Sequence, residues 1–339
     1  MTMMDLPKLI LLDVGHGNCA VLTDTGGVVV IDCPHGITLI DTLKHWSVKE
    51  ISHILISHAD ADHIAGIINL LSDENIRIHN IHLNPDPIKK SEVWQDLRIA
   101  LKDARKRFGT VVSSELTTTK TGKLNIGQVE IQVLAPTPEL ILGGAGGKDL
   151  QGRRLTSNSI SAVIGIAHNS CRIAILAADI DGVGFENLLQ EERDLRADIL
   201  VFPHHGGKPG GEDSKAFAQR LCSLVKPNLV IFSIGRGRFG NPRQEIVEGV
   251  VASVPEAHIL CTQLSQQCAA SLPISEPTHL NSLPAKGRVS NTCCGGTVSI
   301  KIDGSRTNYA ARIALHSEFI DHQVPTPICR KFLSRAKLV

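Results

Sequence analysis

Four side chains that commonly bind metal ions lie within six residues, in the segment His58-Ala-Asp60-Ala-Asp62-His63. Imidazole and carboxylate together suit Zn²⁺, Mn²⁺ or iron, and the carboxylates favour an oxygen-preferring ion such as Mn²⁺. In an extended loop, alternation would direct residues 58, 60 and 62 to one side and residue 63 to the other. One short peptide would then face two metal positions. A solvated loop, in which Asp62 caps a following helix, is the alternative, but so many ligand types so close together favour a metal site.

Further candidate ligands follow apolar segments later in the chain. Asp179, in AILAADID, comes just after one such segment and could bridge two metal ions, although a turn aspartate is the alternative. His204 and His205, in LVFPHHGG, would give one ligand and one proton donor or substrate contact, or else a simple histidine pair at a strand end. Asp13 and Asp32 close other strands. Carboxylates at such positions commonly orient metal-bound histidines, but both would also fit turns.

Short apolar runs rich in β-branched residues must position these groups. The strands that we expect cover residues 8–12, 28–32, 53–57, 129–134, 161–166, 172–177, 199–202 and 229–233. The helices that we expect from the spacing of apolar residues cover 65–71, 91–108, 185–192, 214–224 and 243–253. Because strands and helices alternate, the sequence predicts an α/β protein with mixed sheets. The candidate ligands gather where strands end, which is the usual place for a site in such folds.

Composition limits the classes of protein to which the chain could belong. Among its 339 residues, 42% are apolar and 20% charged, which is ordinary for a globular protein. A net charge of +1 and an aromatic content of 3% exclude binding to nucleic acid by a broad basic surface or by aromatic stacking. Any phosphate recognition must therefore be local. We expect no membrane segment and, with an odd number of cysteines, a cytoplasmic protein with reduced thiols.

Seven short motifs in a fixed order resemble the metallo-β-lactamase superfamily. They are LDVGHGNCAVL, VVIDCPHG, SHADADHIAG, SNSISAVI, ILAADI, FPHHGGK and GRFGNPRQE. They look most similar to the soluble hydrolase domain of ComEC-type competence (DNA-uptake) proteins, which shares an aspartate at position 60 where the wider superfamily has histidine. The resemblance implies an αββα sandwich with the metal site at one edge between the two sheets. It places a hydrolase domain at 1–269 and a C-terminal extension at 270–339.

The resemblance also implies roles for individual residues. The implied metal ligands are His58, Asp60, Asp62, His63, Asp179 and one of the pair His204 and His205. The side chains expected to take part in catalysis are Asp62, His205, Asn158 and Asn241. Asn158 and Ser161 match a polar pair beside the site in relatives, although a capped turn explains them equally well. Asn241 replaces a histidine of the ComEC-type branch, and it can form hydrogen bonds but cannot exchange protons.

Together these residues favour phosphodiester hydrolysis. Two divalent ions about 3.5–4 Å apart can lower the pKa of a bound water toward ~7 and offset phosphoryl charge. Lys208, Arg238 and Arg243 would contact phosphate, unless they form an ordinary solvated loop. We expect a Zn²⁺- or Mn²⁺-dependent phosphodiesterase or nuclease, in which metal-bound hydroxide attacks phosphorus in a nucleic acid or nucleotide. Hydrolysis of a thioester, lactone or lactam stays open. So does a regulatory role in a multi-gene system, such as an antiviral one, with a protein partner bound through the C-terminal extension.

The C-terminal cysteines form a separate pattern. The candidate ligands for a structural zinc ion are Cys261, Cys268, Cys294 and Cys329, with His316 and His322 nearby. Such a site would tie the tail to the core. The spacing matches no standard ribbon or finger, and buried thiols in a core are the alternative.

Overall fold

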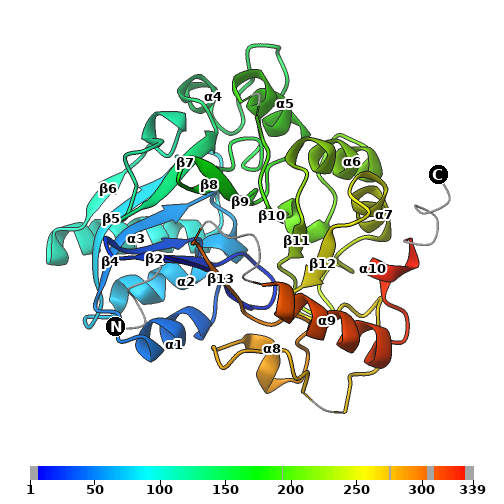
Figure 1. Ribbon diagram of the computed structural model, residues 1–339. Helices are drawn as coiled ribbons and strands as arrows, with labels where there is room; N and C mark the ends of the chain where they lie inside the picture. Colours follow the sequence, from blue (N-terminus) through cyan, green and yellow to red (C-terminus); the bar gives the residue numbers. More distant parts are fainter. Residues whose placement is uncertain (1–6, 193, 275, 304–308, 333–339) are drawn as a thin grey trace.

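The computed structural model describes residues 7–192, 194–274, 276–303 and 309–332. It shows two β-sheets packed face to face, with helices against both outer surfaces (Figure 1). The first sheet has the strand order β13-β1-β2-β3-β4-β5-β6. The second has the order β12-β11-β10-β9-β8-β7. The expected αββα sandwich is therefore confirmed.

The strands of the first sheet are β1 (Lys8–Leu11), β2 (Ala20–Asp24), β3 (Gly27–Ile31), β4 (Glu50–Ile56), β5 (Arg77–Leu83), β6 (Val111–Ser113) and β13 (Val298–Lys301). Those of the second sheet are β7 (Val129–Ala135), β8 (Val163–His168), β9 (Cys171–Leu176), β10 (Ile199–Val201), β11 (Leu229–Phe232) and β12 (His258–Cys261). All the expected strands are present, with ends shifted by a few residues. The expectation of mixed sheets also holds, because β3 and β4 pair in parallel whereas β1 and β2 pair antiparallel.

The helices are α1 (Thr38–His45), α2 (Ala61–Ser72), α3 (Glu92–Phe108), α4 (Pro138–Gly143), α5 (Gly182–Glu191), α6 (Ser214–Val225), α7 (Gln244–Ser253), α8 (Lys286–Val289), α9 (Ala310–Gln323) and α10 (Ile328–Lys331). Two 3₁₀ turns are η1 (Thr118–Lys120) and η2 (Pro203–Gly206). No described helix is both long enough and apolar enough to span a lipid bilayer.

Aliphatic side chains fill the space between the sheets. Leu22 and Ile31 of the first sheet belong to the same buried cluster as Ile164, Leu176 and Ile231 of the second. Alternation along each strand sends one set of residues into this layer and the other toward the helices. Burial of apolar surface contributes about 25 cal/mol per Å², so this continuous layer holds the two sheets together and fixes the ends of their strands relative to one another.

Helix α2 begins earlier than the sequence indicated. The apolar spacing predicts a start near residue 65, but the helix begins at Ala61, directly after Asp60 in extended conformation. Asp62 and His63 consequently lie in the first helical turn, so the expected extended loop with alternating side chains is wrong. The polar first turn carries no apolar periodicity, and for that reason the pattern could not reveal it.

The C-terminal segment is part of both layers. Strand β13 pairs antiparallel with β1, with Leu9 opposite Ile300. From α9 and α10, Phe319 and Ile328 join the buried cluster that covers the outer face of the second sheet. The described residues from 270 to 285 form no helix or strand, and the short helix α8 follows them. The proposed boundary near residue 269 stays a prediction.

Candidate metal centre

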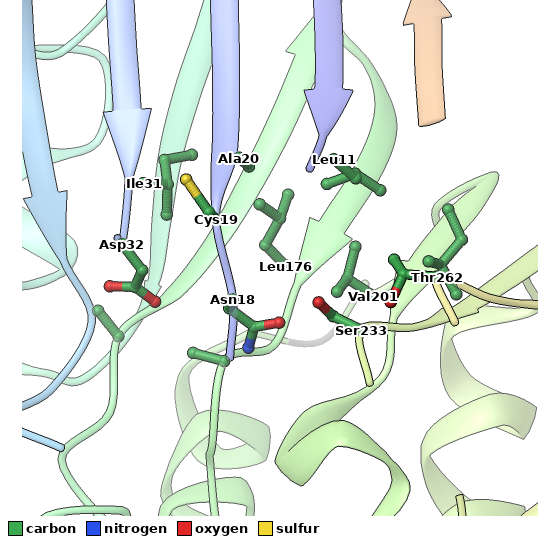
Figure 2. A pocket seen from close by; sticks show the side chains of 13 residues that line it. Leu11, Asn18, Cys19, Ala20, Ile31, Asp32, Leu176, Val201, Ser233 and Thr262 are labelled. Carbon is green, nitrogen blue, oxygen red and sulfur yellow. The ribbon is translucent and has the colours of Figure 1, made fainter. Parts of the chain in front are cut away.

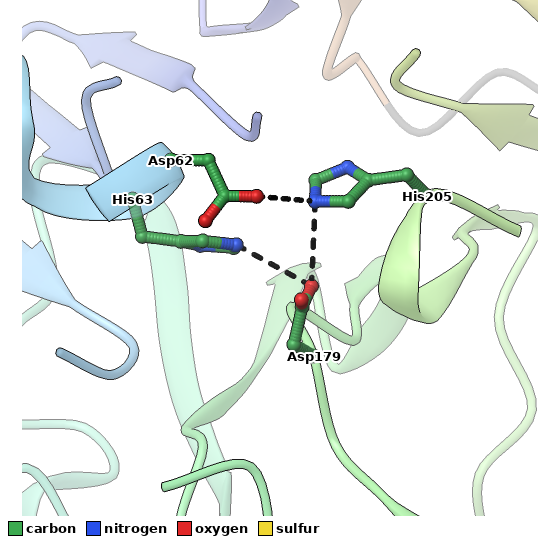
Figure 3. A group of neighbouring side chains, drawn as sticks. All are labelled: Asp62, His63, Asp179 and His205. Carbon is green, nitrogen blue, oxygen red and sulfur yellow. Dashed lines mark ion pairs between the residues drawn. The ribbon is translucent and has the colours of Figure 1, made fainter. Parts of the chain in front are cut away.

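Two carboxylates and two imidazoles converge at one edge of the sandwich (Figure 3). They belong to Asp62, His63, Asp179 and His205, and one donor atom from each lies within 4.8 Å of all the others. His63 Nε2 lies 3.3 Å from Asp179 Oδ1, and His205 Nε2 lies 3.3 Å from Asp62 Oδ2. Among the described residues, no other group of three or more histidine, cysteine or acidic side chains is this compact.

Asp32 fixes the orientation of His63. Its Oδ2 atom lies 2.7 Å from His63 Nδ1 and accepts a hydrogen bond from the hydroxyl of Ser57 at 2.7 Å. Its Oδ1 atom accepts a hydrogen bond from the backbone nitrogen of Ser57, also at 2.7 Å. A proton held on Nδ1 leaves Nε2 free to face Asp179, an arrangement typical of metal-binding histidines. Asp32 therefore occupies the position expected of an orienting carboxylate.

The loop after β10 presents both histidines of the FPHHGG motif. His204 and His205 have φ values of 52° and 55°, in the left-handed region that costs such residues about 1–3 kcal/mol each. His205 Nδ1 donates to the carbonyl of Ser233 at 2.8 Å, and this bond turns its Nε2 toward the cluster. His204 Nδ1 lies 3.6 Å from Asp179 Oδ2. Of the two histidines, the structure places His205 in the compact group, and His204 stands at its side.

His58 and Asp60 lie next to the compact group and outside it. The His58 ring is buried, with its centroid 4.1 Å from that of His63, and its Nδ1 lies 3.0 Å from Ser57 Oγ and 3.3 Å from Ser161 Oγ. Asp60 forms an ion pair with Lys89, and its Oδ2 is 3.9 Å from His58 Nε2. The carboxylate of Asp60 is thus already neutralised by a lysine.

Several buried polar atoms at this edge have no hydrogen-bond partner. They are Nε2 of His58, His63, His204 and His205, and Oδ1 of Asp179. Leaving a buried polar atom unsatisfied costs about 1–3 kcal/mol, so such a concentration in one place calls for a ligand. Imidazole nitrogen with carboxylate oxygen is a donor set that suits Zn²⁺ or Mn²⁺. The residues present therefore fit a divalent cation.

Electrostatics keep His58 neutral and both carboxylates ionised, which are the charge states in which these groups bind a cation. Burial lowers the pKa of His58 to about 4, so its ring is neutral at pH 7. Burial raises the pKa of Asp62, but its contacts with His16 and His205, each at 3.3 Å, hold that pKa well below the usual value. Burial also raises the pKa of Asp179, but the charges of His205 and His63 bring that pKa well below its usual range. Both carboxylates are thus ionised.

His63 behaves differently from His58. Burial alone would lower its pKa, but Asp179 and Asp32 raise it well above the ordinary value. In the metal-free protein the ring consequently carries a proton between two carboxylates. A cation that binds Nε2 must displace that proton, which makes metal affinity depend on pH.

His16 also lies at the centre, although it is not among the residues predicted from the sequence. Its Nε2 is 3.3 Å from Asp62 Oδ2, its ring centroid is 4.4 Å from that of His205, and its Nδ1 is buried without a partner. Gly17 has a φ of 127°, and a Cβ there would lie 2.4 Å from the carbonyl oxygen of Asp62. The glycines on either side of His16, in LDVGHGNC, were the signal for this close approach.

Asp13 forms hydrogen bonds with the C-terminal segment of the chain. Its carboxylate accepts hydrogen bonds from the backbone of Gly15 at 3.1 Å, the side chain of Gln263 at 2.9 Å and the backbone of Gly287 at 2.8 Å. No histidine is among these partners, which differs from the orienting role considered for Asp13. The residue instead ties the C-terminal segment to the loop that carries His16.

The asparagines expected at the site occupy different surroundings. Asn158 lies in the loop before β8, and its Oδ1 is buried without a partner. In the same loop, Ser161 accepts a hydrogen bond from the backbone of Asp179 at 3.3 Å and so joins Asp179 to His58. Asn241 is buried, and its amide donates to the carbonyl of His204 at 3.4 Å. Asn241 thus stabilises the backbone of the loop that carries His204 and His205.

The expected phosphate contacts are spread along the rim. Lys208 and Arg238 are exposed, and within the described part of the chain neither side chain has an acidic partner. Arg243 lies 4.0 Å from Glu245 and lines a separate groove that also contains Glu248. Arg243 and Arg238 therefore line two different grooves.

The four cysteines predicted to bind a structural zinc ion line one buried, mainly apolar cavity of about 10 Å³. It is lined by Cys261, Cys268, Cys294 and Cys329, together with His316. Burial raises the pKa of Cys329 to about 12, so its thiol is protonated in the metal-free protein. Within the described residues, these cysteines do not form a ligand group as compact as that of the metal centre. The structural zinc site stays a prediction.

A small cavity under the centre constrains how a substrate can approach. It has a volume of about 20 Å³ and lies between the sheets, where Leu11, Ile31, Leu176 and Val201 surround it and Asp32 stands at its edge (Figure 2). This volume holds about one water molecule. A substrate must consequently reach the cluster from the outer edge of the sandwich.

Comparison with known proteins agrees with the fold. Residues 12–211 match the family model of the metallo-beta-lactamase superfamily. The chain belongs to this superfamily and is a hydrolase of that class, which confirms the resemblance seen in its motifs.

Individual relatives are distant. The chain is 23% identical over 250 residues to ComE operon protein 3 of Bacillus subtilis (strain 168), which is consistent with the ComEC-type resemblance. The match covers 69% of this chain but only 28% of that much longer protein. Igni18, a metallo hydrolase from Ignicoccus hospitalis, gives a TM-score of 0.47 at 15% identity, covering 87% of this chain and all of its own. YhfI from Bacillus subtilis gives a TM-score of 0.46 at 12% identity, and the match covers 75% of this chain and 96% of YhfI.

Proposed function

We propose that this hydrolase cleaves phosphodiesters in a nucleic acid or nucleotide, with one or two Zn²⁺ or Mn²⁺ ions at the metal centre. The observation that carries the proposal is the compact group of Asp62, His63, Asp179 and His205, in which His63 Nε2, Asp179 Oδ1 and His205 Nε2 are buried without a hydrogen-bond partner. A divalent cation bound there would lower the pKa of a water molecule and offset the negative charge of a phosphoryl group.

The residues around the centre favour an anionic substrate. Asp62 and Asp179 are ionised, and a bound divalent cation would balance their charge. On the outer rim, Arg238 lines a groove together with His16, and no aspartate or glutamate is among its lining residues. Guanidinium groups bind phosphate oxygens through two parallel hydrogen bonds. A phosphodiester that approaches from this side meets positive charge, whereas a neutral lactone or thioester gains nothing from it.

Four residues around the centre would each help to bind that substrate or to orient a metal ligand. Asp32 holds His63 in one tautomer, and Ser233 does the same for His205. Asn241 keeps the strained histidine loop in place. His16, beside Asp62 and open to the groove, is positioned to hold a proton or a substrate oxygen at its Nε2 atom.

Hydrolysis of bis-p-nitrophenyl phosphate tests the proposal. Purified protein, stripped with EDTA and then supplied with Mn²⁺ or Zn²⁺, should release p-nitrophenol, and a second dose of EDTA should stop the release. Thioester, lactone and β-lactam substrates are assayed in parallel. Cleavage of one of these without cleavage of the phosphodiester would overturn the proposal in favour of a carbon-centre hydrolase. Inactivity toward every substrate despite bound metal would favour the regulatory role.

A further inference from the structure

A groove of about 370 Å³ adjoins the metal centre, and the C-terminal segment forms part of it. Its lining includes His16, which follows β1, and Arg238, which follows β11. Lys286 and Ser290 of the C-terminal segment, beyond the proposed boundary near residue 269, also line it. His16 belongs to both places, because its ring faces the groove while its Nε2 lies 3.3 Å from Asp62. Anything bound in the groove therefore lies next to the centre.

The two exposed cations of the groove are available for a ligand. The third, Arg236, is already used, since its guanidinium donates to the carbonyls of Leu264 and Ala269, both at 2.8 Å. Arg238 and Lys286 have no acidic partner among the described residues, and the groove itself has no carboxylate in its lining. Two cations without an acidic partner thus line a groove beside the centre, where they can bind an anionic group.

The backbone holds Lys286 firmly although its side chain is exposed. The backbone nitrogens of Lys286 and Gly287 donate to the carbonyl and carboxylate of Asp13, each at 2.8 Å, and Asp13 is completely buried. The lysine stem crosses the loop before His16, because a Cβ at Gly15 would lie 3.0 Å from Lys286 Cδ and 3.3 Å from Nζ. The ammonium group is thus held over the loop that carries His16.

We infer that Lys286 and Arg238 bind a phosphate that flanks the scissile phosphate in a nucleic-acid strand. The inference rests on the proposed function and narrows its substrate from a nucleic acid or nucleotide to a nucleic-acid strand, because successive phosphates of a strand can occupy the centre and the groove together. It also gives the C-terminal segment a role at the site. The nearly neutral net charge of +1 requires that a strand be recognised at such a local point.

The experiment compares a substrate that can reach the groove with one that cannot. Lys286→Gln, Arg238→Gln and the double variant are assayed with a fluorescent single-stranded oligonucleotide, as DNA and as RNA, and with bis-p-nitrophenyl phosphate. Lys106→Gln, which changes an exposed lysine on α3, is the matched control, and Lys286→Arg tests rescue. KM and kcat are measured from 50 to 300 mM salt.

For the oligonucleotide we expect KM to rise about threefold in each single variant and about tenfold in the double variant, with little change in kcat. The slope of log KM against log salt should become shallower by about 0.7 for each cation removed. The rates of Lys286→Gln with bis-p-nitrophenyl phosphate, and all rates of Lys106→Gln, should stay at the wild-type level. Equal effects of Lys286→Gln on both substrates, or no effect on either, would overturn the inference.

Binding measurements separate this inference from the proposed function. Fluorescence anisotropy of the same oligonucleotide, recorded with EDTA present so that nothing is cleaved, should show weaker binding by the double variant. If the wild type cleaves no phosphodiester, the proposed function fails, and this binding arm alone decides about the groove. If the wild type cleaves phosphodiesters but binds the strand no better than the double variant, only the groove assignment fails.

Discussion

Two histidine clusters in the molecule share buried imidazoles but differ in what surrounds them. In the metal centre, His63 and His205 point their Nε2 atoms toward Asp62 and Asp179. In the C-terminal region, His258 Nε2 lies 2.8 Å from His316 Nδ1, and His316 Nε2 lies 3.3 Å from the thiol of Cys294. His279 adds a hydrogen bond to the carbonyl of Cys294 at 2.6 Å. We call His258, His279 and His316 the C-terminal histidine cluster.

The difference between the clusters shows that carboxylates decide what buried histidines can do. Without an acidic partner in contact, burial lowers the pKa of His258 to about 4 and that of His316 well below its usual value. Their rings stay neutral and pack edge to face, with centroids 4.9 Å apart. In the metal centre, Asp179 and Asp32 reverse the effect of burial on His63. One cluster therefore has the carboxylates that a cation needs, and the other packs α9 against the sandwich.

Among the variants proposed, Asp179→Asn should have the largest effect, because it alters the metal centre and leaves the C-terminal histidine cluster intact. The substitution removes negative charge from the centre without changing its shape, so we expect metal content to fall and phosphodiesterase activity to drop about 10³-fold. Elemental analysis and the bis-p-nitrophenyl phosphate assay measure the two losses. Asp96→Asn, at an exposed position of α3, serves as control and should behave as wild type.

The same variant also tests the C-terminal cysteines. If the metal centre is the single cation site, the Asp179→Asn protein should contain almost no zinc. A residual content near one equivalent would instead support the structural zinc hypothesis. It would also contradict the contrast drawn between the two clusters.

Asp32→Asn should weaken metal binding without removing a ligand. The asparagine can keep the left-handed backbone at this position, where φ is 58°, but it no longer accepts strong hydrogen bonds from Ser57 and His63 on a charged oxygen. We expect the apparent metal affinity to fall about 10- to 100-fold. Competition with a fluorescent chelator measures the affinity. An unchanged affinity would show that Asp32 does not orient His63.

The C-terminal histidine cluster should make stability depend on pH in a defined window. The pKa of His258 is about 4 in the folded protein and about 6.5 when unfolded, so between these values the unfolded chain binds more protons. Its contribution to stability is complete above pH 6.5 and is lost as the pH falls toward 4. When the pH falls from 7 to 4.5, the free energy of unfolding of His258→Gln should decrease by about 1–2 kcal/mol less than that of the wild type.

Urea unfolding of the metal-free proteins measures this difference. The control is His322→Gln, which alters an exposed histidine on the same helix as His316 and should follow the wild-type curve. If the pH dependence of His258→Gln matched that of wild type, the C-terminal histidines would not be held neutral by burial.

Asn241→Ala should have the smallest effect. Its amide donates one long hydrogen bond, 3.4 Å, to the carbonyl of His204, and such a bond contributes about 0.5–1 kcal/mol. We expect kcat with bis-p-nitrophenyl phosphate to fall about threefold and metal content to stay the same. A loss as large as that of Asp179→Asn would mean that Asn241 contacts the reacting groups directly.

Much of the centre could be anticipated from local sequence. Asp62 and His63 follow a strand within a few residues, and Asp179 and His205 do likewise after β9 and β10. Strand patterning depends on neighbouring residues, and the ends of strands in one sheet reach a common edge. Residue types and their nearest context thus determined the fold class, the kinds of ligand and the chemistry that they suit.

Tertiary structure decided what depends on contacts between distant segments. The approach of His16 to Asp62 relies on Gly17 packing against α2, and the pairing of Asp60 with Lys89 diverts a carboxylate that the motif assigned to metal. Asp13 binds Gly287 across most of the chain and brings Lys286 beside the centre. No periodicity encodes these contacts. They arise only when the two sheets and the C-terminal segment pack together, because burial and loop closure then fix which side chains meet.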